Sequence, residues 1–459
     1  MLRDTANPTS PLVRFHKILG HLFFIVLLIY SIVYAVERIT YIDSAWLAFE
    51  RINGETFSFP GNRYGAFFSE ILLFIGTKLH LSFTSLVYLF SASYILLYYS
   101  VWVICTYTLK NSVAGLVIIL GMFMGVREGF IHTVSETHQS FVYSALLFAV
   151  LSFQFQRVGL KYFLVVLTTL AVLYAHPLGI FTSLFVLAYY FTNNRSLRNP
   201  LLWIVAVIII SVTLLNVLFP PNVYDQSQYA RLAASSGIDA LFNSGSLNFL
   251  RIHFIHFYWL PELAFVIVLG ILIFRKEYLK FALLFTGIIG YIVVGSVTFR
   301  NGDSSIMLER IYLPACFMVN LALAEQLFQI KFSLKWLPQL LILFFMINGI
   351  RYINAGCLMY KKRVAYLDEL VQKAMKSGTD KYILSQENAN MDQVLAPWAL
   401  GVETLMYSKY KYDKCVSVTM ETEACDSNGV RLTTFLCLPV KELNPAYFSL
   451  SSNPYQPLP

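Results

Sequence analysis

Long apolar runs recur along most of this chain and constrain its fold more than any other feature of the sequence. Each run of about 15 to 20 residues is long enough, as a helix, to cross a hydrocarbon core of about 30 Å. Of the 459 residues, 57% are hydrophobic and only 13% are charged, whereas soluble domains carry roughly 25% charged residues. We therefore predict an all-α polytopic membrane protein.

The spacing of these runs predicts about eleven transmembrane helices. The first run follows the basic residues Arg3, Arg14 and Lys17, so a cleavable signal peptide is one interpretation. Its length of about 19 residues and the many later runs favour an uncleaved signal anchor. The predicted spans are residues 18–36, 83–108, 112–126, 139–155, 161–175, 177–192, 200–219, 260–274, 279–298, 310–330 and 336–353.

Most lysines and arginines of the transmembrane region lie in short connections on the same side as the N-terminus. Such residues stay on the cytoplasmic side, so we predict a plasma (inner) membrane protein with a cytoplasmic N-terminus and an extracytoplasmic, periplasmic C-terminus. The formal charge of +8 then favours anionic lipid headgroups over nucleic acid as its partner. These basic residues are Lys110, Arg157, Lys161, Arg195, Arg198, Arg275, Lys276, Lys280, Lys331 and Lys335.

The sequence Tyr174-Ala175-His176-Pro177 divides one long apolar stretch into two predicted spans. Proline lacks a backbone N–H and disfavours helix at the residue before it. A single kinked helix is the alternative, and it would reverse the orientation of every later segment. The alternation of basic connections favours two spans with the break at the outer surface.

From about residue 354 the composition becomes that of a soluble protein, so we divide the chain into a transmembrane domain (1–353) and a small extracytoplasmic α/β domain (354–459). We expect an amphipathic helix over Lys361–Lys376 and strands over 382–385, 416–420 and 432–438. An oxidising compartment favours at least one disulfide there, with Cys415–Cys425 the first choice among Cys357, Cys415, Cys425 and Cys437.

The first outer loop, residues 37–82, places a carboxylate a few residues beyond the first span. Asp43 opens an amphipathic stretch containing the interfacial aromatics Trp46 and Phe49, and residues 64–80 form a second such stretch. Asp43 is therefore a candidate catalytic acid facing outward. The alternative is that it only caps the helix that begins there.

The second outer loop, residues 127–138, concentrates ionisable residues at a membrane surface, where they are costly and often functional. Glu128 and Glu136 are candidate catalytic acids, and His132 would share a face with Glu136 if the loop were helical. His138 with Glu136 could hold a divalent cation, although their spacing matches no common metal motif. A solvated loop capped by Ser135 is the alternative.

Cationic and imidazole side chains form a third group on the predicted outer face. An arginine fork matches the geometry of a phosphate and stays charged, so Arg300 and Arg310 are candidate phosphate-binding residues. His253 and His176 are candidates for the same cavity. An ion pair with Glu309 or Asp303 is the alternative for Arg310.

A carboxylate just after the first span, on an outer loop of interfacial helices, followed by acids in the second outer loop, resembles the GT-C superfamily of membrane glycosyltransferases. The resemblance covers the whole topology, including a C-terminal domain outside the membrane. It implies that Asp43 matches the first-loop catalytic acid and Glu128 or Glu136 the second-loop acid. The chain lacks an acidic pair at Asp43 and a Trp-Trp-Asp-type tail motif, so no subfamily is assigned.

The resemblance implies transfer, with inversion, of a sugar from a polyprenyl-phosphate-linked donor to a glycan, lipid or protein acceptor. No cofactor is certain, and magnesium or manganese is an optional one. The competing functions are a transporter or lipid-linked glycan flippase, a polysaccharide polymerase or ligase, and an assembly scaffold. Glu325 is an acid within a span, as a transport pathway would require, but most candidate polar residues lie at the outer surface.

Overall fold

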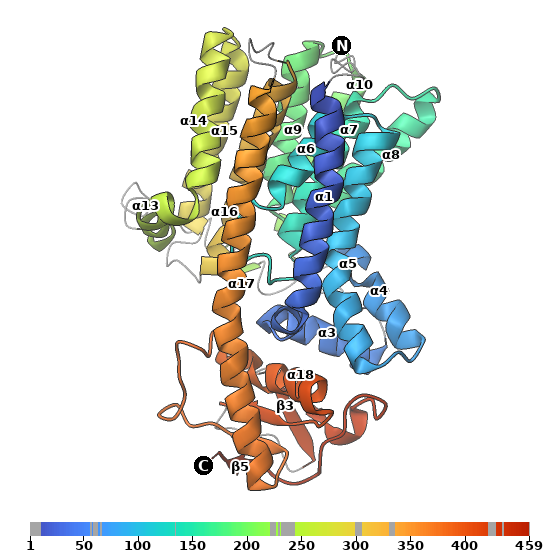
Figure 1. Ribbon diagram of the computed structural model, residues 1–459. Helices are drawn as coiled ribbons and strands as arrows, with labels where there is room; N and C mark the ends of the chain where they lie inside the picture. Colours follow the sequence, from blue (N-terminus) through green and yellow to red (C-terminus); the bar gives the residue numbers. More distant parts are fainter. Residues whose placement is uncertain are drawn as a thin grey trace.

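The structure is a computed structural model. It describes residues 11–55, 57, 63–64, 67–133, 135–220, 226–227, 230, 244–298, 305–329, 336–420, 428–433 and 436–458, with the backbone alone at 253–255, 257, 305–307 and 436. The helices form a long bundle, and a smaller domain containing short strands, which we call the tail (354–459), lies at one end of it (Figure 1).

Helices account for most of the described chain. The elements before the tail are α1 (Pro11–Val33), α2 (Ala35–Ile39), α3 (Ile42–Gly54), α4 (Phe67–Lys78), α5 (Phe83–Val103), the π-helix η3 (Ile104–Thr108), α6 (Ser112–Gly121), α7 (Glu136–Ser152), α8 (Val158–Ala175), α9 (Gly179–Asn194), α10 (Pro200–Leu218), α13 (Gly245–Phe257), α14 (Trp259–Phe274), α15 (Tyr278–Thr298), α16 (Ser305–Gln329) and α17 (Leu337–Ser377).

Seven helices of the described chain are long and apolar enough to cross a membrane, and α6 and α14 are shorter apolar helices. Helix α1 presents Ile18, Leu22, Ile25 and Ile29 outward, each more than half exposed, at intervals of three or four residues. A single apolar stripe on the outside of a helix is what lipid contact requires. The protein is therefore membrane-embedded, while the count of eleven spans stays a prediction.

A helix occupies each predicted span, although the bounds differ. Helix α6 ends at Gly121, five residues before the predicted end of its span, and a series of turns follows it. Helices α8 and α9 are separate, with extended backbone at His176 between them. Helix α17 continues without interruption through the predicted domain boundary at 353/354, so it links the bundle to the tail (Figure 1).

Helix α16 lies at the centre of the bundle. Its apolar segment is 89% buried, whereas those of α10 and α15 are each 28% buried, and it packs against α6, α14 and α15. The first described turns of α16 therefore hold Arg310 among other helices rather than against lipid.

The predicted amphipathic stretches of the first outer loop are α3 and α4, which lie between the bundle and the tail (Figure 1). One hydrophobic cluster joins Ala45, Phe49 and Ile52 of α3 to Phe448 and other side chains of the tail. The first outer loop is thus packed on both sides, and its position depends on the tail as well as on the bundle.

The tail combines the end of α17 with η4 (Pro397–Ala399), α18 (Leu400–Tyr412), η5 (Val440–Glu442) and five short strands. Strands β1 (Lys381–Ile383), β2 (Ser417–Thr419) and β5 (Gln456–Pro457) form a parallel sheet in the order β2-β1-β5, with Tyr382 opposite Val418. Strands β3 (Gly429–Thr433) and β4 (Leu436–Pro439) form an antiparallel pair. The strand predicted over 432–438 is therefore two strands of a hairpin.

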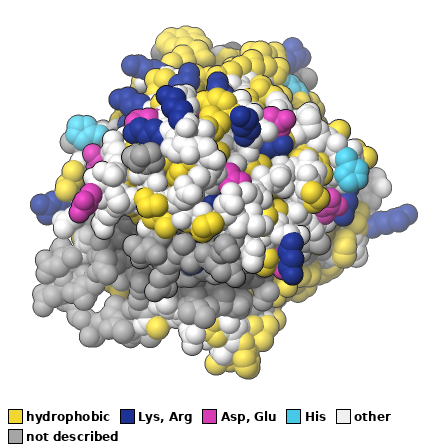
Figure 2. Space-filling model, turned by 90° about the horizontal axis from the view of Figure 1, so that it is seen from below, with side chains coloured by type: hydrophobic (Ala, Val, Ile, Leu, Met, Phe, Trp, Pro, Cys, Tyr) yellow, Lys and Arg dark blue, Asp and Glu magenta, His cyan; other side chains and the backbone are white. Residues whose placement is uncertain are grey.

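The tail end of the molecule exposes positive and negative side chains interspersed with one another (Figure 2). Two exposed ion pairs of this kind are Lys373–Glu369 and Lys409–Asp413. Mixed charges of this sort suit contact with water, in contrast to the apolar outer surface of the bundle.

Cys437 is disulfide-bonded, whereas Cys357 and Cys415 are free and buried. The first-choice pairing of Cys415 with Cys425 is therefore wrong. Cys415 packs in the tail core, where its sulfur accepts the Ser449 amide at 3.4 Å, and this contact uses it as a small core residue. Cys425 itself lies outside the described residues.

Candidate functional site

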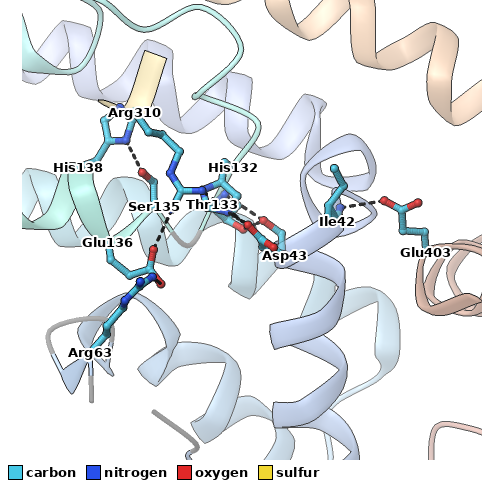
Figure 3. Close-up of polar contacts among 11 residues, drawn as sticks. Ile42, Asp43, Arg63, His132, Thr133, Ser135, Glu136, His138, Arg310 and Glu403 are labelled. Carbon is cyan, nitrogen blue, oxygen red and sulfur yellow. Dashed lines mark hydrogen bonds and ion pairs between the residues drawn. The ribbon is translucent and has the colours of Figure 1, made fainter. Parts of the chain in front are cut away.

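Asp43 lies in the first turn of α3, and its side chain does not cap the helix. The N-cap residue is Tyr41, which makes no side-chain capping bond. The first amide of the helix, that of Ile42, donates instead to Glu403 of α18 at 2.9 Å. The carboxylate of Asp43 is thus left to face the loop that follows α6 (Figure 3).

The part of the second outer loop that precedes α7, residues 127–135, is held by a carboxylate from α16. Three successive amides, those of Arg127, Glu128 and Gly129, donate to Glu309 Oε2 at 3.0, 3.0 and 2.8 Å. Consecutive backbone N–H groups of this kind form a concave anion site. Here the carboxyl group of Glu309 occupies this position, so the loop is fixed by the residue next to Arg310.

Two further contacts join this loop to the first outer loop. The amide and hydroxyl of Thr133 donate to Ser44 Oγ at 3.2 and 2.9 Å, and Arg38 of α2 donates to the Phe130 carbonyl. Gly356 of α17 packs against the carbonyl of Arg127, where a Cβ would come within 2.2 Å of the oxygen. The loop is therefore held from several helices, and its irregular backbone is preorganised.

Asp43, His132, Arg310 and Glu136 lie together in one polar cluster (Figure 3). Asp43 Oδ2 is 3.3 Å from His132 Nε2 and 3.6 Å from Arg310. Arg310 also donates to Glu136 at 3.1 Å, and Glu136 lies 3.4 Å from Arg63. Four segments far apart in the sequence, namely α3, the stretch around Arg63, residues 132–136 and α16, thus meet at one point.

The members of the cluster differ in access to solvent. The Asp43 side chain is 44% exposed, whereas those of His132, Arg310 and Glu136 are 1%, 12% and 12% exposed. A group that exchanges a proton with a substrate must be reachable. Asp43 is therefore the most accessible member, Arg310 and Glu136 are partly accessible, and the buried His132 can act only through Asp43.

The pKa values within the cluster follow from desolvation and from these charges. Desolvation raises the pKa of Asp43, but the hydrogen bond and charge of His132, with the charges of Arg310 and Arg63, more than offset it and hold the pKa below its usual value. Burial and then Arg310 lower the pKa of His132 below 6.5, against the effect of Asp43. At neutral pH the pair is thus an ionised carboxylate beside a neutral imidazole.

The ion-pair partners of Arg310 and the position of Glu136 differ from the alternatives that the sequence left open. Arg310 pairs with Asp43 and Glu136 rather than with Glu309, whose carboxylate accepts the loop amides, and Asp303 lies outside the described residues. Glu136 does not share a helical face with His132, because α7 begins at Glu136 and residue 132 is in the loop. The two side chains nevertheless reach the same cluster through Arg310.

His138 lies in the first turn of α7 with its ring buried. Its Nδ1 is 2.6 Å from the Ser135 hydroxyl, which makes no capping bond to α7. No group of three or more potential metal ligands occurs within the part of the chain that the structure describes. The optional magnesium or manganese site at His138 and Glu136 stays a prediction.

The remaining predicted site residues are Glu128, His176, Arg300 and His253, and the structure describes the side chains of the first two alone. The Glu128 side chain is buried, while His176 accepts the Leu178 amide at 3.1 Å and joins α8 to α9. Burial, followed by the charges of Arg63 and Arg310, places the pKa of His176 well below 6.5. Arg300 lies outside the described residues, and His253 lies on α13 with its side chain not described.

Four participants are revealed by the structure alone: Arg63, Glu309 as a loop anchor, and the buried pair Arg363–Glu403. Arg363 of α17 donates to both carboxylate oxygens of Glu403 and to the Thr40 carbonyl at 3.2 Å. The pair therefore ties α17 and α18 to the start of α3. Arg363 is 40 residues from Glu403 and 323 residues from Thr40 in the sequence. No local sequence pattern identifies either Arg363 or Glu403 as part of the site.

Comparison of the chain with models of protein families, with curated proteins and with solved structures finds no match.

Proposed function

We propose that this protein is a membrane glycosyltransferase that moves a sugar from a polyprenyl-phosphate-linked donor to an acceptor on the outer face of the membrane. The observation that carries the proposal is the cluster of an accessible, ionised Asp43 with a guanidinium 3.6 Å away, at the junction of bundle and tail. A base and a phosphate-binding cation are the two groups that transfer from a glycosyl phosphate needs.

In the proposed reaction, Asp43 accepts the proton of an acceptor hydroxyl while the hydroxyl oxygen attacks the anomeric carbon. The bond between that carbon and the phosphate oxygen breaks, and its electron pair leaves with the polyprenyl phosphate. Arg310 stabilises the developing phosphate charge, for which its planar fork is suited. His132 keeps Asp43 oriented, and Glu136 with Arg63 holds Arg310.

The depressed pKa of Asp43 is compatible with this role. A carboxylate below its usual pKa is a weak base, so it takes the proton late, as the new bond forms. A phosphate is a good leaving group and does not require a strong base. The acidic partners also matter for Arg310, because its ion pairs with Asp43 and Glu136 hold its guanidinium beside Asp43 before a donor binds.

The proposed orientation places the cluster and the tail outside the cell and the N-terminus in the cytoplasm. It rests on the basic connections around Lys110, Arg157, Arg195 and Lys276, which join helices at the end of the bundle opposite the tail. A lipid-linked donor would then reach the cluster from the outer leaflet, with its phosphate at headgroup depth.

The test measures release of polyprenyl phosphate from synthetic polyprenyl-phosphate sugars by the purified full-length protein, with an extract of membrane lipids and glycans supplying the acceptor hydroxyls. This product forms whichever acceptor in the extract takes the sugar. Asp43→Asn keeps the shape of the side chain and removes the base, so release should fall on the order of 10² to 10⁴-fold. Asp392→Asn is the matched control, since Asp392 is an exposed tail acid, and it should behave as wild type.

Arg310→Lys should impair use of the donor because a point charge cannot reproduce the guanidinium fork. Both variants must retain the helical circular dichroism and elution volume of wild type. Wild-type release by a folded Asp43→Asn variant would contradict the proposed role of the carboxylate. Lipid movement without any cleavage of the sugar phosphate would support a flippase instead.

A further inference from the structure

A second polar region lies at the end of the bundle away from the tail, where α9 ends and α14 turns into α15 (Figure 1). A pocket of about 470 Å³ opens there between the end of α9, the α14–α15 turn and the end of α16. Pockets of roughly 300 to 1,000 Å³ suit ligands of small-molecule size. This pocket is separate from the cluster around Asp43, so its contents are independent of the proposed transfer reaction.

The acids near this pocket are already neutralised. Lys280 lies 2.7 Å from Glu325 and 3.1 Å from Glu277, and Arg275 lies 2.9 Å from Glu277. Tyr189 and Asn193 also donate to Glu325, at 2.5 and 3.0 Å. The buried acid within the bundle, Glu325, therefore has a structural ion-pair network.

Two cations remain after this pairing. Arg195 and Lys276 both line the pocket, both are exposed, and neither side chain has an ion-pair or hydrogen-bond partner among the described residues. Each follows a helix C-terminus, where a cation is favourable. That effect accounts for a cation at each helix end, but it does not account for the two cations lining the same pocket.

The surroundings of the two cations are apolar on the lipid-facing side. Phe274, Tyr278 and Leu279 are 89%, 62% and 51% exposed, and the last two line the pocket. A ligand here would meet positive charge and exposed apolar surface together. Basic pockets between transmembrane helices at the cytoplasmic surface bind phosphate-bearing lipid headgroups in this way.

We propose that this pocket binds the phosphate group of an anionic phospholipid, with Arg195 and Lys276 at the phosphate and Tyr278 and Leu279 beside the acyl chains. The Glu325–Lys280 network forms the base of the site and keeps its acids from repelling the ligand. The proposed lipid comes from the leaflet on the basic side of the bundle, opposite the side of the cluster around Asp43.

The test compares binding of phosphatidylglycerol and phosphatidylcholine to the delipidated full-length protein by native mass spectrometry. Both cations have left-handed backbone, with φ of 48° and 58°, so Asn is the substitution best tolerated there. Arg195→Asn with Lys276→Asn should weaken phosphatidylglycerol binding about thirty-fold, at about a factor of five or six for each cation near a lipid surface.

Lys110→Asn with Arg157→Asn is the matched control. These cations are exposed on the same side of the bundle, and Lys110 also has a positive φ of 49°, so the control should bind phosphatidylglycerol as wild type does. Arg195→Lys with Lys276→Arg keeps both charges and should retain the preference for phosphatidylglycerol. Equal phosphatidylglycerol binding by wild type and the double Asn variant would overturn the proposal. Binding of inorganic phosphate as strong as that of the lipid would overturn its lipid part.

Discussion

The buried pair Arg363–Glu403 predicts that the tail controls the start of α3 and thereby the position of Asp43. Glu403 is fully buried, and it accepts both the guanidinium of Arg363 and the first amide of α3. Glu403→Ala removes both acceptors at once. Among the described residues, Arg363 then keeps the carbonyl groups of Thr40 and Gln393, both at 3.2 Å, as its partners, and its charge is left buried.

The expected cost is large because it has two parts. Removing one partner of a buried ion pair costs about 3 to 5 kcal/mol, since the other charge stays desolvated. Losing the acceptor at a helix N-terminus costs about 1 kcal/mol more. Glu403→Gln keeps an acceptor of the same shape for the Ile42 amide, so it should be less harmful than the Ala variant.

Hydrogen exchange of the α3 amides, measured by mass spectrometry on the full-length protein in detergent, reads out this effect locally. A loss of about 4 kcal/mol from a local opening equilibrium accelerates exchange roughly 10³-fold. The matched control is Glu369→Ala on α17, which removes an exposed pair with Lys373 at 2.8 Å and should cost at most about 0.5 kcal/mol. If α3 exchanges no faster in Glu403→Ala than in Glu369→Ala, the tail does not hold the site.

Two further predictions concern the second outer loop. Gly356→Ala should destabilise the loop, because the new Cβ would lie 2.2 Å from the Arg127 carbonyl oxygen. Gly290→Ala is the control, since the space around its Cβ is open. Proteolysis within residues 127–135 should be faster in the Gly356→Ala variant, and equal rates in the two variants would contradict the packing argument. His132 has a lowered pKa when folded, so its contribution to stability is complete above about 6.5 and is lost as the pH falls below that value. The thermal stability advantage of wild type over His132→Asn should therefore shrink between pH 7.5 and 5.5, and an advantage that grows on acidification would refute the sign.

The outer loops show how far local sequence can predict this site. Asp43, Glu136 and Arg310 were identifiable because an ionisable residue beside an apolar span is costly and therefore informative. Their mutual contacts were not identifiable, since Arg310 could as well have paired with its neighbour Glu309. That choice depends on the loop amides of residues 127–129, which take the carboxylate of Glu309 and leave Arg310 to Asp43 and Glu136.

The tail shows the same limit in another form. The amphipathic helix after residue 361 was predicted correctly, but its fusion with the last apolar span into one 41-residue helix was not. Helical periodicity gives no signal at the point where the solvent changes from lipid to water, because the backbone hydrogen bonds are the same in both. The cysteine pairing failed because spacing says nothing about which sulfur atoms meet in a folded core.

The sequence by itself determined that this chain is a membrane-embedded helical protein, where its helices lie, and which outer-loop residues carry charge. These properties depend on the local balance of apolar and ionisable residues, which can be read from each segment of the sequence separately. Only the tertiary structure decided that Asp43 faces His132 and Arg310, that Glu309 serves the loop, and that Arg363 and Glu403 fasten the tail to α3. Arg363 and Glu403 are 40 positions apart, and Glu403 lies 361 positions from the Ile42 amide that it accepts. The cost of leaving a buried charge unpaired selects such contacts only once the helices have packed.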